Sequence, residues 1–208
     1  MSKSYQSPLL ERYRRYRTVS TKLNHKILNA YMTTAIFDSA TQTLGLGKNK
    51  SLILDSEDEL AILMEYGLYE IHQEDSKNII QRYYENNKGV NRIERELLEA
   101  MRKAVTGLFV IKHLLPQQCQ LKLQGLDNPA RTVVLTDINL SQSAVESYIL
   151  FFRPIELAEL TMTTGIAFAF EPEMEKTLLD HWKNCNESER YEKIFRLSKE
   201  QGIPTLFG

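Results

Sequence analysis

Residues 132–152 read TVVLTDINLSQSAVESYILFF, and this stretch decides the fold class. Thr132–Thr136 is β-branched and apolar, Tyr148–Phe152 is an apolar run of strand length, and turn formers around Asn139 lie between them. No helical pattern long enough for a parallel crossover separates the two runs. The stretch therefore predicts two strands of an antiparallel sheet.

Two further runs extend this sheet in both directions along the chain. Leu121–Leu123 alternates apolar and polar residues, and Ile166–Phe170 alternates large and small side chains. Gly165, just before the last run, predicts a bend or bulge. Short strands at these spacings predict an antiparallel β-meander or small barrel over roughly residues 108–170.

Helical periodicity dominates the chain before this sheet. Apolar residues spaced by three, four or seven predict one amphipathic helix over about residues 8–43, ended by Gly45. Ser56, with Glu59 three residues later, has the form of a capping box and predicts a second helix, which the polar residues 72–76 interrupt. Asn91 is the predicted cap of a third helix.

Two helices are predicted after the sheet, the first opened by Pro172 and the last capped by Asn186 and ended at Gly202. The fold class is therefore α+β, with a helical N-terminal half, a small antiparallel β-meander or barrel and two C-terminal helices. This order divides the chain into residues 1–107 and 108–208, which could also form one integrated domain.

The composition is that of an ordinary globular protein. The 208 residues are 42% hydrophobic and 25% charged, which excludes collagen-like, low-complexity and globally disordered chains. No apolar run reaches the ~18 residues of a spanning helix, and the first residues lack the apolar centre of a secretory signal. Cys119 and Cys185 have no metal-ligand or redox spacing. We expect a soluble, cytoplasmic protein with free thiols.

The net charge of −1 conceals an asymmetry, because residues 1–30 carry a net +6 and the remainder −7. The candidate anion-binding or partner-binding residues of the first helix are Arg12, Arg14, Arg15, Arg17, Lys22 and Lys26. With Tyr13 and Tyr16 interleaved, these residues could clamp phosphates and stack on bases, or lie on an anionic membrane. Alternatively, the tyrosines face the core or a dimer partner, and the basic side chains are solvated or pair with the acidic remainder. An isoelectric point of about 6.5, against ~9 for a typical nucleic-acid domain, favours this alternative.

The sequence carries no catalytic or metal-binding signature. None of the four histidines (His25, His72, His113 and His181) has zinc-ligand spacing, and the side chains of Glu70, His72 and Glu74 diverge on a helix. Gly45 and Gly47 lack the phosphate-loop spacing, and Cys119 is interpreted as a buried structural cysteine. We therefore predict no metal and no cofactor.

Asp137 is the most distinctive acidic residue, because it follows an apolar strand and precedes Asn139 and Ser141. These oxygens could surround a cation or orient a general base at the rim of the sheet. The preferred interpretation is a turn in which Asp137 bonds the backbone two residues further on.

Six segments together resemble a group of uncharacterised bacterial proteins. They are Glu65–Glu70, Gln81–Tyr84, Glu96–Met101, Leu108–Val110, Thr136–Ser141 and Met162–Gly165. The resemblance covers about residues 60–170 and implies a helical N-terminal part followed by a compact β-meander. It implies no activity, cofactor or site residue.

The absence of a convergent catalytic set favours a non-catalytic protein-interaction or structural module, which could form a homodimer through its first helix. The alternative is a nucleic-acid-binding protein that uses the basic helix. A third hypothesis, an enzyme with its site at the rim of the sheet, depends on Asp137 alone.

Overall fold

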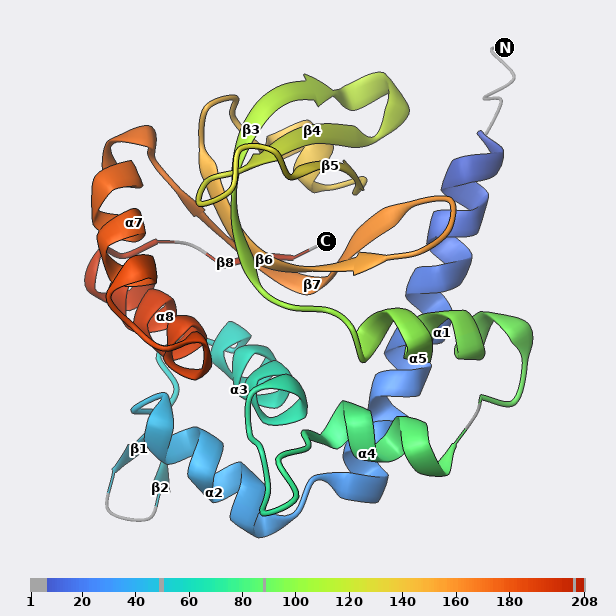
Figure 1. Ribbon diagram of the computed structural model, residues 1–208, viewed down its shortest axis with the longest axis vertical. Coiled ribbons are helices and arrows are strands. Elements are labelled where there is room, and N and C mark those ends of the chain that lie inside the picture. The colour runs from blue at the N-terminus through green and yellow to red at the C-terminus, as the bar shows by residue number, and fades with distance from the viewer. Residues whose placement is uncertain (1–6, 49–50, 88, 204, 208) are drawn as a thin grey trace.

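The computed structural model describes residues 7–48, 51–87, 89–203 and 205–207 (Figure 1). It confirms the α+β class: a helical N-terminal half, a small β-barrel and C-terminal helices follow one another along the chain. The helices are α1 (Pro8–Tyr31), α2 (Thr34–Thr43), α3 (Asp58–Tyr69), α4 (Ile79–Asn86), α5 (Arg92–Met101), α6 (Leu140–Ser143), α7 (Glu175–Lys183) and α8 (Arg190–Glu200), with 3-10 turns η1 (Pro116–Gln118), η2 (Pro172–Met174) and η3 (Glu187–Glu189). The strands are β1 (Gly47–Lys48), β2 (Ser51–Leu52), β3 (Gly107–Leu115), β4 (Gln120–Gly125), β5 (Thr132–Thr136), β6 (Ile149–Glu156), β7 (Thr161–Phe170) and β8 (Thr205–Phe207).

Five strands close into a barrel in the order β5-β4-β3-β6-β7. Strand β8 pairs with residues 166–168 of β7, on the edge of β7 that does not pair with β6. Neighbouring strands are antiparallel, except that β5 and β7 close the barrel as a parallel pair at Leu135 and Thr161. The strands do not follow a simple meander, because β6 returns to pair with β3 instead of β5. Neither β3 nor β8 was among the predicted strands.

Buried side chains from β3 to β7 fill the barrel. They form one cluster that includes Phe109, Leu123, Leu135, Leu150 and Phe152. Alternate residues of β6 belong to other clusters, so that this strand is buried on both faces. That double burial explains why residues 149–152 are a continuous apolar run and not an alternating one.

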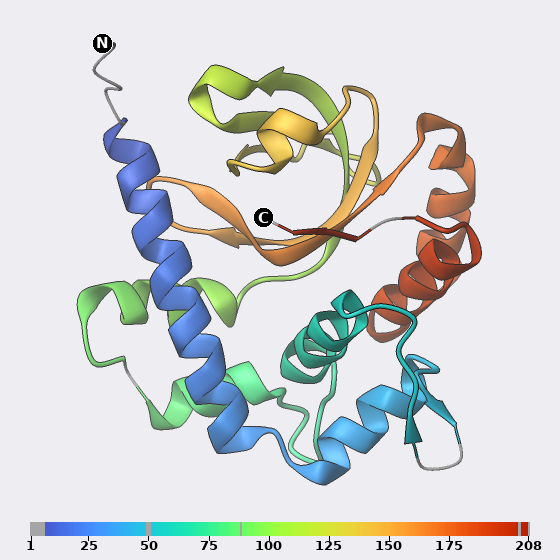
Figure 2. The same cartoon turned by 180° about the vertical axis from the view of Figure 1, so that it is seen from behind.

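Helices cover the outside of the barrel in two groups (Figures 1 and 2). Helices α3, α7 and α8 pack with α2 against Phe151 and Phe168. Helices α1, α4 and α5 pack on the C-terminal end of β6 and the N-terminal end of β7, where Ile155 and Met162 are buried. The hydrophobic cluster under each group of helices contains side chains from residues 1–107 and from residues 108–208.

Two predicted helix boundaries were wrong. The helix expected over residues 8–43 is two helices, because the Thr33 hydroxyl accepts from the Ile36 N–H and begins α2 after a turn at Met32. The side chain of Ser56 does not cap α3; instead, the Glu59 carboxylate accepts from the Asp55 N–H at 2.7 Å.

Other predicted boundaries are confirmed by side-chain caps. Asn91 accepts from the Glu94 N–H and begins α5. Asn186 and Glu189 form the expected capping box, but it opens the 3-10 turn η3 before α8. The interrupted second helix is two helices, α3 and α4, the latter capped by Asn78.

Candidate functional site

Helix α1 is held on the barrel by a buried ion pair between Arg17 and Asp137. A guanidinium nitrogen of Arg17 lies 3.0 Å from Asp137 Oδ2, and Arg17 also donates to the hydroxyl and carbonyl oxygens of Thr163 at 2.7 and 2.8 Å. Asp137 is fully buried, and its Oδ1 accepts from the Leu140 N–H at 2.9 Å. The Tyr13 hydroxyl completes this set of contacts, which we call the α1 latch.

The contacts of the α1 latch give Asp137 a structural role. The preferred turn interpretation was correct in kind, although the hydrogen bond reaches three residues on and not two. The carboxylate lies beneath α1 and is fully buried, so it does not form an open site at the rim of the sheet. The structure thus provides no support for the hypothesis of an enzyme centred on Asp137.

The other basic residues of α1 divide into two kinds. Arg12 pairs with Glu159, and Lys26 lies 2.7 Å from Glu94. Arg14, Arg15 and Lys22 are exposed and form no ion pair with any described residue. Tyr13 and Tyr16 are buried, and the Tyr16 hydroxyl bonds to Glu96. The six candidate residues therefore do not form one continuous free basic surface.

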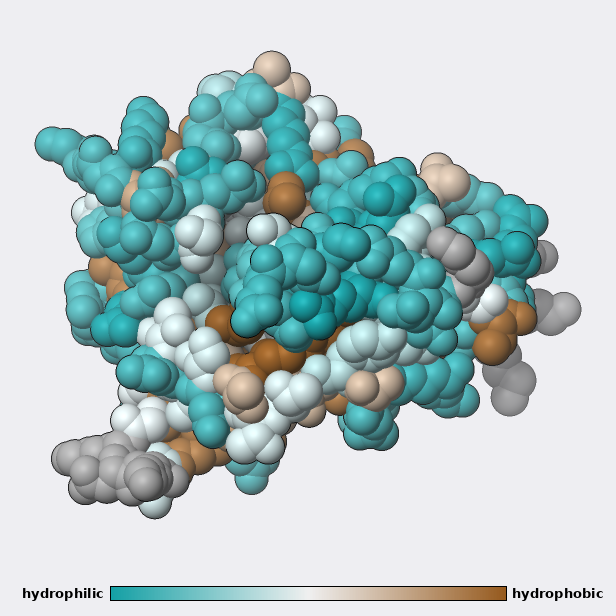
Figure 3. Space-filling model, turned by 60° about the horizontal axis from the view of Figure 1, so that its bottom comes forward, coloured by the Kyte–Doolittle hydropathy of each residue, from teal (hydrophilic) through white to brown (hydrophobic). Residues whose placement is uncertain are grey.

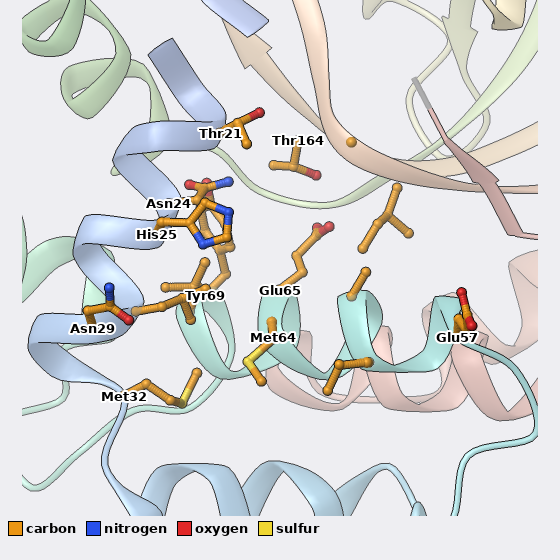
Figure 4. A pocket seen from close by; sticks show the side chains of 16 residues that line it. Thr21, Asn24, His25, Asn29, Met32, Glu57, Met64, Glu65, Tyr69 and Thr164 are labelled. Atoms are coloured by element: carbon orange, nitrogen blue, oxygen red, sulfur yellow. The ribbon is translucent and has the colours of Figure 1, made fainter. Parts of the chain in front are cut away.

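A cleft lies beside the C-terminal half of α1, which lines it with Thr21, Asn24, His25, Leu28 and Asn29. It has a volume of about 850 Å³ and is enclosed by α1, α3 and the Thr164–Ile166 segment of β7 (Figure 4). Its apolar walls are formed by Leu28, Met32, Leu60, Met64, Leu68 and Ile166. On the side where α2, α3 and α4 lie, the surface is largely hydrophilic, and hydrophobic surface gathers in a hollow (Figure 3).

Glu65 is the buried charged residue of this cleft. It comes from the middle of α3 and is only 7% exposed, and its carboxylate points toward Thr164 (Figure 4). Behind it lies Arg153 of β6, whose Nε is 3.7 Å from Glu65 Oε1, which is beyond hydrogen-bond length. The guanidinium of Arg153 also contacts Glu70 and donates to the Ala104 carbonyl at 2.8 Å. We call Glu65, Glu70 and Arg153 the cleft cluster.

The cleft cluster is electrostatically unbalanced, since two carboxylates share one guanidinium. Burial raises the pKa of Glu65 to about 7, and the charge of Arg153 only partly opposes that rise. Burial also raises the pKa of Tyr69, whose ring lies 4.2 Å below the Arg153 guanidinium, and the pKa of Tyr191. Near neutral pH, Glu65 is therefore the group in this cluster that exchanges a proton.

Four buried polar atoms at or behind the cleft lack a hydrogen-bond partner within the described part of the chain. Two belong to the lining, Asn24 Oδ1 and Thr164 Oγ1, and two lie behind it, Arg153 Nε and the Tyr191 hydroxyl. Buried polar atoms are nearly always paired in proteins, because an unpaired one costs about 1–3 kcal/mol.

Sequence reasoning missed both Glu65 and Arg153. Each has a visible signal: Glu65 lies within the apolar residues 60–69, and Arg153 interrupts the apolar run from Ile149 to Ile155. A charge inside an apolar element is rarely buried unless it has a partner, so each residue signals a buried ion pair, although only the fold shows that the two are partners. Glu70 was considered only as a metal ligand beside His72 and Glu74. The described residues contain no group of His, Cys, Asp or Glu that could hold a metal ion.

The remaining sequence candidates lie away from the cleft. His113 is exposed on β3, 3.9 Å from Glu146. Cys119 and Cys185 are both partly buried free thiols, and Cys119 takes a left-handed conformation with φ of 52° after η1. No helix among the described residues is long and apolar enough to cross a membrane.

These features define a class: an α+β protein with a five-stranded barrel, a helical cover and a cleft with a buried carboxylate. Residues 7–208 match the model of DUF7986, a family of unknown function, and the chain belongs to that family. The match confirms the predicted resemblance to an uncharacterised family and extends it beyond residues 60–170. No curated protein and no solved structure matches the chain.

Proposed function

We propose that this protein is a non-catalytic binding protein that holds a small amphipathic molecule in the cleft between α1, α3 and β7. The observation that carries the proposal is a cleft of about 850 Å³ with apolar walls around a single buried carboxylate. Sites for small molecules typically have volumes of about 300–1,000 Å³, mostly apolar walls and a few placed polar groups. The cleft has each of these properties.

The alternative for such a carboxylate is general acid-base catalysis, because a pKa near 7 suits that role. A catalytic site also needs a nucleophile or a stabilising donor directed at the same reacting atom. The described lining contains no serine, cysteine, lysine or arginine; its hydroxyl groups are those of Thr21, Thr164 and Tyr69, and its one imidazole, His25, is exposed on α1. Ligand binding requires only the cleft and its polar groups, whereas catalysis would also require such a directed partner group.

Titration with a hydrocarbon dye tests this proposal. Diphenylhexatriene has no hydrogen-bonding group and fluoresces only in apolar surroundings, so we expect saturable fluorescence with the native protein. Ala61 is exposed and lines the cleft on α3, so Ala61→Trp should fill the space and abolish the signal. Ala130→Trp, in the exposed β4–β5 turn, is the matched control and should bind like the native protein. Equal binding by both variants would refute the proposed site.

The two functions predicted from the sequence remain predictions alongside this one. Nucleic-acid binding would depend on Arg14, Arg15 and Lys22, since the other three candidates are paired within the chain. Three phosphate contacts on double-stranded DNA would give a slope of log affinity against log salt of about −2.7. An affinity that does not change with salt would rule this function out.

A protein partner or homodimer would have to use surface other than the apolar face of α1. Tyr13, Tyr16, Leu23 and Ile27 are buried within the chain itself. The molecular mass in solution decides whether the protein is a monomer or a dimer.

A further inference from the structure

We infer that the ligand of the cleft is a cationic amphiphile, a molecule with an ammonium group that binds against Glu65 and an apolar body that lies between α1 and α3. This inference rests on the binding function proposed above and names the chemistry of the ligand. It is carried by the charges that line the cleft, by the imbalance of the cluster behind them and by the acceptor groups at Glu65.

The charges that line the cleft are acidic. The carboxylates of Glu57 and Glu65 lie at different points along α3, and neither lysine nor arginine is among the 16 residues of the lining (Figure 4). The cations of α1 are elsewhere, because Lys22 is exposed outside the lining and Lys26 is paired with Glu94. A carboxylate-bearing ligand would therefore meet two carboxylates and, as the one side chain able to carry positive charge, His25, whereas an ammonium group would be complementary to Glu65.

The buried cluster behind the wall is one positive charge short. Arg153 is the partner of both Glu65 and Glu70, and it is also committed to the Ala104 carbonyl and to the ring of Tyr69. The other titratable groups packed on the cluster are the phenols of Tyr66, Tyr69 and Tyr191, which are neutral at physiological pH. When both carboxylates are ionised, the cluster has a net charge of −1, which burial makes costly. Either a proton or a ligand cation can neutralise it.

The acceptors around Glu65 match the donors of an ammonium group. A primary ammonium has three N–H donors and no acceptor, as in the side chain of lysine. The Glu65 carboxylate of α3 points toward Thr164 of β7, and the Asn24 amide of α1 borders the same part of the cleft (Figure 4). The carboxylate and the Thr164 hydroxyl together offer acceptors from two elements.

The rest of the cleft suits an aliphatic or aromatic body. Leu28 and Met32 of α1 face Leu60 and Met64 of α3 across it. Methionine is unbranched and adapts to ligands of different shape. The ligand class is therefore defined by its charge and amphipathic character more than by one particular skeleton.

Competition among three ligands of equal chain length tests the inference. Octylamine, 1-octanol and octanoate each displace diphenylhexatriene from the native protein at pH 8, and their affinities are compared. We expect octylamine to bind at least about ten-fold more tightly than 1-octanol, and octanoate to bind most weakly. In Glu65→Gln the advantage of octylamine over 1-octanol should fall below about two-fold, while the dye still binds. Glu74→Gln, exposed in the turn between α3 and α4 and outside the lining, is the matched control and should keep the advantage.

The outcomes separate the two proposals. If diphenylhexatriene does not bind, or binds equally to Ala61→Trp, the proposed binding function fails. If the dye binds at the cleft but the three ligands bind equally, or octanoate binds most tightly, the binding function survives and the cationic ligand is refuted. A folded Glu65→Gln protein that keeps the native preference also refutes it. The comparison of ligands on the native protein remains decisive if Glu65→Gln does not fold.

Discussion

Two buried ion clusters lie close to the same helix, and they differ in how completely they are satisfied. In the α1 latch, one cation meets one anion, and hydrogen bonds from Tyr13 and Leu140 complete the set around Asp137. In the cleft cluster, one cation serves two anions, and Glu65 lies 3.7 Å from its nearest ionic partner. The latch is neutral and its carboxylate is fully buried, whereas the cleft cluster has excess negative charge beside an open space.

This difference indicates which cluster is structural and which is functional. A buried pair with full hydrogen bonding fixes the position of a helix, and breaking it is costly. A buried carboxylate that lacks full compensation lowers the stability of the fold, and such groups cluster at functional sites. The following predictions test that distinction, from the largest expected effect to the smallest.

Arg153→Met should have the largest effect. It leaves Glu65 and Glu70 buried without a cation and removes the hydrogen bond to the Ala104 carbonyl. We expect a loss of about 4–5 kcal/mol in the free energy of unfolding at pH 7, measured by urea denaturation. Adding Glu65→Gln to this variant should restore part of the loss, because it removes one of the two uncompensated charges. Full additivity of the two changes would show that they are not coupled.

Arg17→Met should have the next largest effect, because it opens the α1 latch. Asp137 would keep its bonds to Tyr13 and Leu140 but lose its only ion pair among the described residues. We expect a loss of about 3 kcal/mol with unchanged binding of the dye. Arg14→Met, three residues earlier and exposed, is the control and should change stability by less than about 0.5 kcal/mol. A similar small change for Arg17→Met would remove the structural role of the latch.

Glu65→Gln should stabilise the protein, and the gain should depend on pH. The pKa of Glu65 is about 7 in the folded state against 4.5 for a free side chain. The folded state therefore holds this proton more tightly than the unfolded state, and native stability falls as the pH rises from 4.5 to 7. Above pH 7 the cost is about 3 kcal/mol, which glutamine does not incur. Denaturation at pH 4 and pH 8 should show little gain at the lower pH and about 2–3 kcal/mol at the higher one. A variant that is less stable at pH 8 would contradict the predicted imbalance.

Gly67→Ala should have the smallest effect on stability but should still alter the cleft. A Cβ on Gly67 would lie 2.6 Å from the terminal methyl of Met32, which lines the cleft. Because that methyl is the end of a flexible chain and alanine favours helix, we expect a stability change below about 1 kcal/mol. The displaced Met32 should weaken dye binding several-fold, and Met32→Ala in the same protein should restore it. Native affinity in Gly67→Ala would show that Met32 does not shape the site.

The same two clusters show how far the sequence predicts this molecule. The barrel follows from local patterns, because the apolar run of β5 and the alternation in β7 depend only on neighbouring residues. Asp137 could be interpreted as a turn residue for the same reason. The closure between β5 and β7 and the return of β6 to β3 depend on contacts between distant segments, which local periodicity does not report.

The cleft cluster could not be predicted from local sequence patterns, because it also joins distant segments. Glu65 and Arg153 are 88 positions apart, and only the packing of α3 on β6 brings them together. Each looked like an isolated charge in an apolar element. The basic residues of α1 were found because they are neighbours in the sequence, but their pairing with Glu159, Asp137 and Glu94 required the fold.

The most direct test of the central claim is a titration of the Glu65 carboxyl by carbon-13 NMR, with its resonance assigned by its absence from Glu65→Gln. The free protein should show a Glu65 pKa of about 7. Saturation with octylamine should lower this pKa by about one unit or more, because a ligand that prefers the ionised carboxylate ten-fold shifts its titration by one unit. A Glu65 pKa near 4.5 in the free protein, or one that octylamine leaves unchanged, would contradict the account.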